Sequence, residues 1–531
     1  MQPPKLIITD QQARTRLKAG VDKLADVVKS TLGPGGSNVI LDYNGLYGIT
    51  KDGVSVASMI YLEDVVENIG AQVVKEAASK TAREAGDGTT TATVLAQAIF
   101  AAGIKNITAG AKPLDIKRGI DMAVALIVPE IKKLSVPVKT QEDIQAIANI
   151  SSNGDSEISY LITAAIDKVG KDGLVFVEDA KALKSDWKVV DGMQFDRGYM
   201  SGHFVTDEHR AEVLFDKPIV LIYDGAIAKM RELVPLLKIA QDHPDLKGHQ
   251  ILLIAEDYTK ELVDTLAYNK IKAGLQICAV QAPDFQDVRK EVMKDIAALT
   301  GATVITKEAG LTLENATAEV YGSADKIRVT AWQTTIMGGH GAEERTAREN
   351  VIREQMKSTN DHALEVLKQR LARLTNGVAV IYVGGASDVE IREKKDRIDD
   401  ALHATRAAIE EGIVQGGGMA YLLAFEGVRW PEESNEDVSI GMEILFNSIE
   451  VPIKTIAENV GVSGDVVLAG VREKNLGYNA RTKKYENLIA AGIVDPTKVV
   501  RLALENAASV AGMLLTTNAI VAIKPKDEEK R

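Results

Sequence analysis

The stretch Gly86-Asp-Gly-Thr-Thr-Thr-Ala-Thr-Val-Leu-Ala96 decides how this sequence is interpreted, because it joins a flexible turn to an apolar helical run. A helix that begins here presents free backbone N–H groups, the positive end of the helix dipole and three adjacent hydroxyl groups. Such a site suits an anion such as a phosphate chain. Asp and Thr are also favoured N-cap residues, so a purely structural helix start explains the stretch equally well.

Asp87 brings a carboxylate to the same turn. A carboxylate beside phosphates is repelled unless a divalent metal bridges them, so in the phosphate interpretation Asp87 is a Mg²⁺ ligand. Two further glycine clusters, Thr31-Leu-Gly-Pro-Gly-Gly36 and Gly416-Gly-Gly418, adjoin predicted helices, and glycine lets a backbone approach a ligand closely. A plain turn or a helix C-cap explains each cluster alone.

The motifs of the common nucleotide and hydrolase sites are missing. Neither Gly-x-x-x-x-Gly-Lys-Ser/Thr nor Gly-x-Gly-x-x-Gly occurs at these loops. Asp52, Asp400 and Asp495 each precede Gly, Ala or Pro, which leaves room for a ligand, although single carboxylates of this kind are more often caps or surface groups. The seven histidines form no His-x-x-x-His pair and no Ser/His/Asp order, so we expect neither a metalloprotease nor a triad hydrolase.

Length and composition indicate a multidomain globular protein. The 531 residues exceed what one hydrophobic core serves, and 45% apolar with 26% charged residues is ordinary for a soluble chain. A net charge of −12 disfavours nucleic acid as a partner, because phosphate binding needs a basic surface. Cys278 is the only cysteine, which excludes an intrachain disulfide and fits a reducing cytoplasm.

Two segments bear on membranes and export. The N-terminal ten residues lack a basic region followed by an apolar run, so we expect no secretory signal. Asn506 to Ile523 is uncharged and about as long as a membrane span, but it contains Asn, Ser and Thr. We therefore expect no membrane association, and predict a buried helix that leads into a strand.

The N-terminal part is predicted to be helical with a small strand ribbon. Apolar spacing predicts a helix over Gln12 to Thr31. Short strands are predicted at 38–42 and 48–50, around an Asn44-Gly45 turn. Residues 64–110 are predicted to be almost wholly helical, with an interruption at 86–88.

The pattern of apolar residues changes at Gly173. From there, short apolar runs alternate with helical segments, as in an α/β domain. A charged helical hairpin over 343–373 and a buried strand over 378–383 follow, and Ala-rich helices return from about Asp399. One helical domain built from both chain ends, with an α/β domain inserted through a smaller middle unit, is therefore predicted. The expected α/β strands are Leu174-Val-Phe-Val177, Ile219-Val-Leu-Ile-Tyr223, Ile251-Leu-Leu-Ile254, Ile277-Cys-Ala-Val280 and Val304-Ile305.

Taken together, these motifs resemble the GroEL-type group I chaperonins, in order from about residue 8 to residue 523. The matching stretches are Thr31-Leu-Gly-Pro34, Ile49-Thr-Lys-Asp-Gly-Val-Ser-Val56, Gly86 to Ala96, Gly192-Met-Gln-Phe-Asp-Arg-Gly-Tyr199, Asp400-Ala-Leu-His-Ala-Thr-Arg-Ala407 and Asp495-Pro-Thr-Lys498. The resemblance implies a multidomain α and α/β fold with three domains: an equatorial ATPase domain (1–136 and 411–531), an intermediate hinge domain (137–191 and 377–410) and an apical substrate-binding domain (192–376).

The resemblance also implies an ATP site with Mg²⁺ and K⁺. Asp87 is expected to hold Mg²⁺, and Thr31, Lys51 and Thr90 to help place K⁺. Asp400 is expected to orient the attacking water, with Asp52 close to the γ-phosphate, because phosphoryl transfer depends on positioning and charge neutralisation. The implied ATP contacts are Thr31, Leu32, Gly33, Pro34, Lys51, Asp87, Gly88, Thr89, Thr90, Thr91, Gly417, Asn479, Ala480, Arg481 and Asp495.

An apolar groove that binds non-native polypeptide is implied as well. An exposed apolar stripe is usually a binding surface; without the resemblance, the same residues read as core. The implied groove residues are Tyr199, His203, Phe204, Val234, Leu237, Val263, Ala267 and Tyr268. His203 and Ala267 stand where the family prefers bulkier apolar groups, which suggests a weaker or differently selective groove.

The implied assembly is a homo-oligomeric ring, expected to be heptameric, with unfolded polypeptides as clients and a co-chaperonin lid as a further candidate partner. Gly461-Val-Ser-Gly464 lacks the acidic residues usual at the ring-to-ring contact, so a single ring is a hypothesis beside the double ring. The charged tail from Lys524 replaces the family's glycine-methionine tail. These departures suggest a specialised or phage-encoded member of the family. We expect it in the cytoplasm of a bacterium or of a phage-infected host cell.

The predicted function is an ATP-dependent chaperonin that binds non-native polypeptides in a ring chamber and promotes their folding. Two alternatives are a ring-forming scaffold that has lost turnover, and a metabolic ATP-dependent enzyme such as a small-molecule kinase. The intact Asp52, Asp87 and Asp400 argue against the scaffold. A metabolic enzyme would be a monomer or dimer stimulated by a metabolite.

Overall fold

The computed structural model describes residues 4–523 except 44–45, 153–154, 171–172, 181, 208–209, 285, 358–360, 376 and 432. Its contacts divide the chain into two compact units. Residues 1–163 and 393–531 form the first unit, which both chain ends therefore build, and residues 164–392 form the second. The three domain boundaries given above stay a prediction. The predicted fold class, a multidomain α and α/β protein, is confirmed: the chain combines many helices with mixed α/β sheets.

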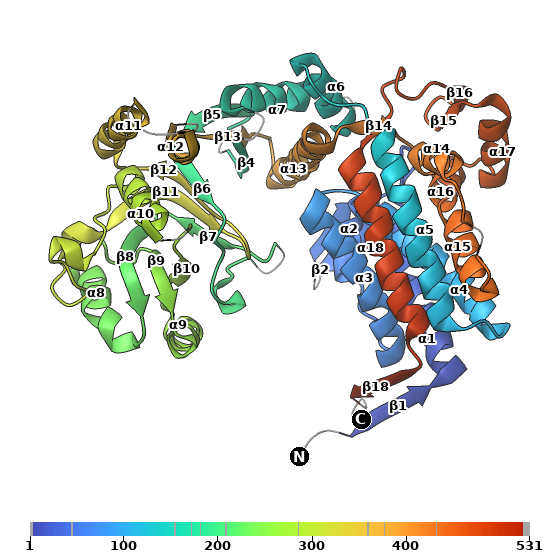
Figure 1. Cartoon of the computed structure of the whole chain (residues 1–531), viewed down its shortest axis with the longest axis horizontal. Coiled ribbons are helices and arrows are strands. Elements are labelled where there is room, and N and C mark those ends of the chain that lie inside the picture. Colours follow the sequence, from blue (N-terminus) through green and yellow to red (C-terminus); the bar gives the residue numbers. More distant parts are fainter. Residues whose placement is uncertain are drawn as a thin grey trace. The chain divides into compact units, whose positions relative to one another are not determined.

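The first unit is a helical bundle (Figure 1) in which the C-terminal helix α18 (Thr497–Thr516) packs against α3, α4 and α5. By length and composition α18 could cross a membrane, but 72% of its apolar window is buried inside the unit. It leads directly into strand β18, as predicted. The other long helices of the bundle are α1 (Asp10–Lys29), α3 (Val65–Ala85), α4 (Thr89–Thr108) and α5 (Pro113–Lys133).

Two strand pairs accompany the bundle. Strand β1 (Lys5–Thr9) pairs antiparallel with β18 (Ala519–Ile523), so the first and last described strands lie side by side (Figure 1). Strands β2 (Val39–Tyr43) and β3 (Leu46–Thr50) form the predicted hairpin; its Asn44-Gly45 turn lies outside the described residues.

Shorter elements complete the first unit, and two helices, α7 and α13, run across the division between the units. These elements are α2 (Gly53–Met59), α6 (Gln141–Ser151), α7 (Ser156–Val169), α13 (Asp388–Glu411), β14 (Ile413–Gln415), α14 (Met419–Gly427), α15 (Glu436–Ser448), α16 (Val451–Asn459), α17 (Gly464–Lys474), β15 (Gly477–Asn479), β16 (Lys484–Glu486) and β17 (Val494–Pro496).

The second unit contains a seven-stranded sheet of order β10-β9-β8-β11-β12-β6, with β7 paired to β11. Strands β8, β9 and β10 are parallel and the others antiparallel. Almost every residue at the start of the parallel strands is buried, which explains their continuous apolar runs. The strands are β6 (Gly192–Phe195), β7 (Val213–Asp216), β8 (Ile219–Ile227), β9 (Ile251–Tyr258), β10 (Ile277–Gln281), β11 (Gly322–Val329) and β12 (Thr334–Gly339).

A three-stranded sheet of order β4-β13-β5 and several helices complete this unit. The strand predicted at Val304-Ile305 is wrong: Ile305 makes only a single bridge, to Tyr223, before a short 3₁₀ helix begins. The predicted helical hairpin is present as α11 and α12. The elements are β4 (Leu174–Asp179), β5 (Asp186–Val190), β13 (Val378–Val383), α8 (Met230–Asp242), α9 (Lys260–Ala273), α10 (Gln286–Thr300), α11 (Ala342–Lys357), α12 (Asp361–Thr375), η1 (Gly202–Phe204), η2 (Lys307–Ala309) and η3 (Ala318–Val320).

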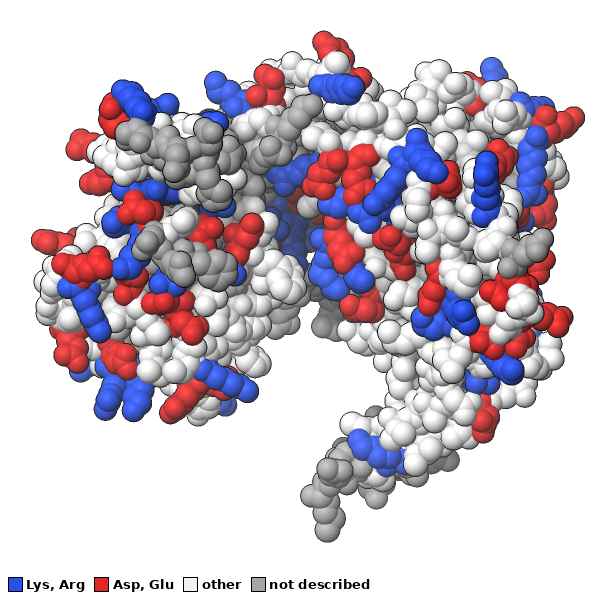
Figure 2. Space-filling view, in the orientation of Figure 1, with Lys and Arg blue, Asp and Glu red and all other residues white. Residues whose placement is uncertain are grey.

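A buried ion cluster ties α10, α11 and α12 together. Acidic and basic side chains are interspersed on the face shown in Figure 2, but Asp295 on α10 is only 1% exposed. Its carboxylate accepts hydrogen bonds from Arg348 Nε at 2.7 Å, Arg370 Nε at 2.8 Å and Arg370 Nη2 at 2.9 Å. Two guanidinium groups on two helices therefore meet at one buried carboxylate, and both also pair with the more exposed Glu291.

We expect Asp295→Ala to destabilise the second unit by about 3–5 kcal/mol, because it leaves two guanidinium groups without their main buried partner. The protection of the α10 amides from hydrogen exchange measures this loss of stability. The matched control is Glu354→Ala, which removes an exposed pair with Lys357 and is expected to cost less than about 1 kcal/mol. Equal protection of α10 in the two variants would contradict the cluster's role.

Candidate functional site

The turn between α3 and α4 is built on two glycines. Gly86 ends α3 with φ +76°, and Gly88 precedes α4 with φ +83°. A Cβ added to Gly86 would lie 2.3 Å from Cβ of His403, and one added to Gly88 would lie 2.6 Å from Cγ1 of Val499. Only glycine combines this left-handed backbone with so close an approach. The turn is thus pressed against α13 and α18.

Asp87 does not cap the helix that follows it. The N-cap of α4 is Gly88, and no side chain makes a capping hydrogen bond there. Asp87 accepts a hydrogen bond from the adjacent Gly88 N–H at 2.5 Å. The capping alternative drawn from the sequence is therefore wrong for Asp87, and the first N–H groups of α4 have no side-chain cap.

The start of α2 lies against the start of α4. Asp52 caps α2, accepting hydrogen bonds from Val54 N at 3.1 Å and Ser55 N at 2.8 Å. A Cβ added to Gly53 would lie 2.2 Å from Oγ1 of Thr90. A capping role of the kind expected for a single carboxylate is thus present at Asp52, which also lies close to the threonine turn.

The first glycine loop is anchored from a distant helix. Asn459 at the end of α16 donates hydrogen bonds to Lys29 O and Leu32 O, both at 2.9 Å. A Cβ added to Gly36 would lie 3.0 Å from Cε of Lys51, so the Lys51 side chain passes over this loop. Sequence reasoning missed Asn459 because its partners lie more than 400 residues away and no local pattern marks it.

Asp400, on α13, joins this group of carboxylates. Burial, and then the charges of Asp87 and Asp52, raise the pKa of Asp400 to about 8. Burial and the charge of Asp52 likewise raise the pKa of Asp87. Both residues keep solvent-exposed surface, so protein surrounds these carboxylates while water still reaches them. Like charges held close in such surroundings favour the neutral acids.

Asp495 on β17 extends the group toward the third glycine cluster. Burial and the charge of Asp87 raise the pKa of Asp495 to about 6, against a hydrogen bond from the Gly417 backbone N–H that lowers it. A Cβ added to Gly416 would lie 3.1 Å from Oδ1 of Asp495. The structure therefore brings Asp52, Asp87, Asp400 and Asp495 together electrostatically.

The β15–β16 hairpin carries the last predicted nucleotide contacts. Asn479 Oδ1 accepts a hydrogen bond from Arg481 N at 3.0 Å, and its Nδ2 donates to Glu486 Oε1 at 2.6 Å. Ala480 is buried and Arg481 is exposed. The hairpin shares one apolar cluster with the start of α14, through Leu488, which lies 3.8 Å from a Cβ placed on Gly417.

The donor set suits a magnesium ion that arrives with phosphate. Among the described residues, no group of three or more His, Cys, Asp or Glu side chains is arranged to hold a metal by itself. Mg²⁺ commonly uses one or two carboxylates together with phosphate oxygens and waters. Asp87, next to an uncapped helix start, offers one carboxylate at the place where phosphate is favoured.

The predicted polypeptide groove is only partly on the surface. Phe204, Val263 and Ala267 are buried in the core of the second unit, so their side chains do not face solvent here. Tyr199 and Leu237 are half-buried, whereas His203, Val234 and Tyr268 are exposed. The expectation that all eight form an exposed stripe is therefore corrected; their role in binding stays a prediction.

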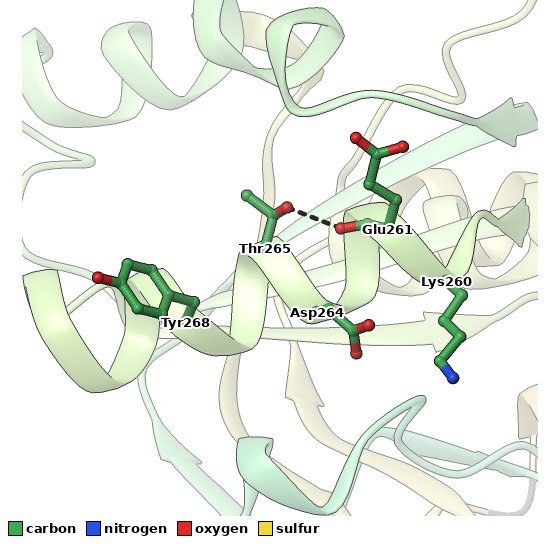
Figure 3. A pocket seen from close by; sticks show the side chains of 5 residues that line it. All are labelled: Lys260, Glu261, Asp264, Thr265 and Tyr268. Atoms are coloured by element: carbon green, nitrogen blue, oxygen red, sulfur yellow. Dashed lines mark hydrogen bonds between the residues drawn. The ribbon is translucent and has the colours of Figure 1, made fainter.

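Tyr268 lies in an open pocket along α9 (Figure 3). The other side chains that line it are polar: Lys260, Glu261, Asp264 and Thr265. Thr265 Oγ1 donates a hydrogen bond to Glu261 O at 2.7 Å. The exposed surface of α9 thus places one aromatic ring among charged groups, which the motif match did not indicate.

Known protein structures share this architecture. The chain is similar to two crystal structures of the chaperonin gp146 from bacteriophage EL of Pseudomonas aeruginosa, determined in the presence of ATP-BeFx. The TM-scores are 0.68 and 0.61 at 19% identity; both matches cover 98% of this chain, and 100% and 99% of gp146. At that identity the likeness shows the fold alone. The model of the TCP-1/cpn60 chaperonin family matches residues 24–525, and the chain therefore belongs to that family.

Proposed function

We propose that this protein is an ATP-dependent chaperonin, which binds non-native polypeptides and promotes their folding through cycles of ATP binding and hydrolysis. The observation that carries the proposal is the convergence of Asp52, Asp87 and Asp400 on the uncapped start of α4. Family membership supports it, as does the ATP analogue present with gp146. Mg²⁺ and K⁺ are the proposed ions.

The proposed roles follow from the positions of the side chains. The N–H groups of α4 and the hydroxyls of Thr89, Thr90 and Thr91 bind phosphate oxygens, and Asp87 holds Mg²⁺, which would neutralise charge on the phosphates. Asp400 orients the attacking water and accepts its proton. Asp52, held by its two backbone N–H donors, lies beside the γ-phosphate in this proposal.

The proposed assembly is a homo-oligomeric ring of seven copies, single or double, in the cytoplasm. Its proposed clients are unfolded polypeptides that contact Tyr268 and Val234, with a co-chaperonin lid as a further partner. Family membership supports ring formation. Thr31, Lys51 and Thr90 are the proposed K⁺ neighbours, because Lys51 and Thr90 both approach the loops around the carboxylates.

We expect Asp400→Ala to lower kcat for Mg²⁺- and K⁺-dependent ATP hydrolysis by about a hundredfold or more, because it removes the proposed base. Nucleotide binding should persist. The matched control is Glu410→Ala on the same helix, whose carboxylate pairs with Lys498 and should leave kcat unchanged. Particle mass is read on the same samples. Hydrolysis unaffected in Asp400→Ala would favour a different base; a small particle stimulated by a metabolite would favour a metabolic enzyme.

The raised pKa of Asp400 predicts a pH-dependent gain in stability for Asp400→Asn. The folded-state pKa of about 8 exceeds the ordinary value, so wild-type stability falls as pH rises from about 4 to about 8 while the Asp400 carboxyl ionises. The Asn variant lacks this titration, and its advantage in melting temperature should grow over that window and level off above it. The comparison variant Asp64→Asn should behave differently, because hydrogen bonds and the Arg16 ion pair outweigh burial and lower the pKa of Asp64. Its loss of stability should be constant over this window and should shrink only as pH falls below about 4. A pH-independent difference for Asp400→Asn would contradict the prediction.

We expect Tyr268→Ser to weaken binding of an unfolded model polypeptide about fivefold, since an exposed aromatic anchor is worth roughly 1 kcal/mol. Fluorescence titration with a chemically denatured client measures the affinity, and ATP hydrolysis should be unchanged. The matched control is Leu214→Ser, which removes an exposed apolar side chain from β7 in the same unit. Equal affinities for wild type and Tyr268→Ser would remove α9 from the client site.

A further inference from the structure

The second unit contains a Ser-His-Asp arrangement outside the nucleotide site. Ser323 and Asp325 lie two residues apart on β11, so their side chains leave the same face of the strand. His340 directly follows β12, the antiparallel neighbour of β11. Ser323 Oγ lies 2.9 Å from His340 Nδ1, and His340 Nε2 lies 3.0 Å from Asp325 Oδ1. Sequence order alone does not indicate this set, because the pairing of β11 with β12 assembles it.

The hydrogen bonds determine which imidazole nitrogen carries the proton. An ionised carboxylate can only accept, so His340 Nε2 must donate to Asp325. In the neutral imidazole Nδ1 then carries the lone pair, and Ser323 donates its hydroxyl proton to it. This is the relation of nucleophile, base and orienting carboxylate that activates serine. The two ring nitrogens are exchanged relative to the serine-protease triad, but the roles follow from the proton and not from the atom name.

The backbone around the arrangement is shaped to hold it. Gly338 has φ +66°, and a Cβ added there would lie 2.0 Å from Oδ2 of Asp325. A side chain at this position would therefore displace the carboxylate. Lys217 N donates a hydrogen bond to Asp325 O at 2.7 Å, and His340 N donates to Ser323 O at 3.3 Å. The nucleophile and the base are thus tied to each other through the backbone as well.

The helix α11 begins two residues after His340, at Ala342. The first N–H groups of a helix lack partners within it, and this end of the helix dipole is positive. The first turn of α11 also carries Glu343 and Glu344, so two acidic residues offset this positive end. The His340 and Asp325 side chains are 53% and 64% exposed, so small molecules reach the arrangement from solvent.

We propose that Ser323 is a nucleophile that takes up the acyl group of small activated carboxylic esters. Ser323 Oγ attacks the ester carbonyl carbon while its proton passes to His340 Nδ1. The tetrahedral intermediate collapses, and the alcohol or phenol departs with that proton, leaving acyl-Ser323. Water then attacks the acyl group by the same route and releases the carboxylic acid. Asp325 is a positioning residue that holds the imidazole tautomer.

The test uses the full-length protein and p-nitrophenyl acetate. We expect release of p-nitrophenol and a transient acetyl group on the peptide that contains Ser323, identified by mass spectrometry after acid quenching. Ser323→Ala and His340→Gln should each lower the rate at least about tenfold. The matched control is His243→Gln, since His243 is a half-buried histidine in the same unit whose Nδ1 accepts a hydrogen bond from Asp245 N at 3.4 Å. Its rate should equal that of wild type.

Asp325 is tested by comparison of two substitutions. Asp325→Asn can donate to the imidazole and so favours the wrong tautomer, and it should lower the acylation rate. Asp325→Glu should restore part of it, a rescue that a merely structural role would not produce. The mass assignment is made on wild type and does not depend on how the variants fold. No acetyl group on Ser323, or a wild-type rate in His340→Gln, overturns the proposal.

Discussion

The close packing of the α3–α4 turn is the constraint on which the site depends. Gly86 and Gly88 bring the backbone so near to His403 and Val499 that a single added carbon would collide. Both partners lie in the C-terminal part of the chain, on α13 and α18. The start of α4 can therefore take this form only when the two chain ends fold as one unit. The same packing draws Asp400, one turn before His403, toward Asp87.

This arrangement has an electrostatic cost, and the raised pKa values of Asp87, Asp400 and Asp495 express it. Each carboxylate loses water contacts and faces like charge, so its ionised form is disfavoured. Sites of chemistry are where such destabilised groups concentrate. Asp52 differs in its partners, because two backbone N–H groups donate hydrogen bonds to its carboxylate. The group therefore combines a carboxylate held by the backbone with carboxyls whose protonation responds to what binds beside them.

Sequence patterns predicted most of the fold and singled out the four carboxylates that the structure groups together, but they did not predict the side-chain environments. Periodicity located α18, β18 and the helices around Gly86, because apolar spacing reports directly on burial. The resemblance named Val263 as a groove residue but could not show that its side chain faces the core. The contacts of Asn459 join segments more than 400 residues apart, for which a single sequence gives no local signal. The pairing of Ser323 with His340 depends on the register of β11 and β12, which apolar spacing does not specify.

The position of Asp400 has a further consequence for how the molecule works. Helix α13 (Asp388–Glu411) begins in the second unit and continues into the first, so the residues before 393 and Asp400 belong to one continuous hydrogen-bonded helix. The proposed base therefore lies on an element that is continuous with the unit that carries Tyr268. The residues that connect the two units and the residue proposed to activate water belong to the same helix, because α13 contains both residue 392 and Asp400.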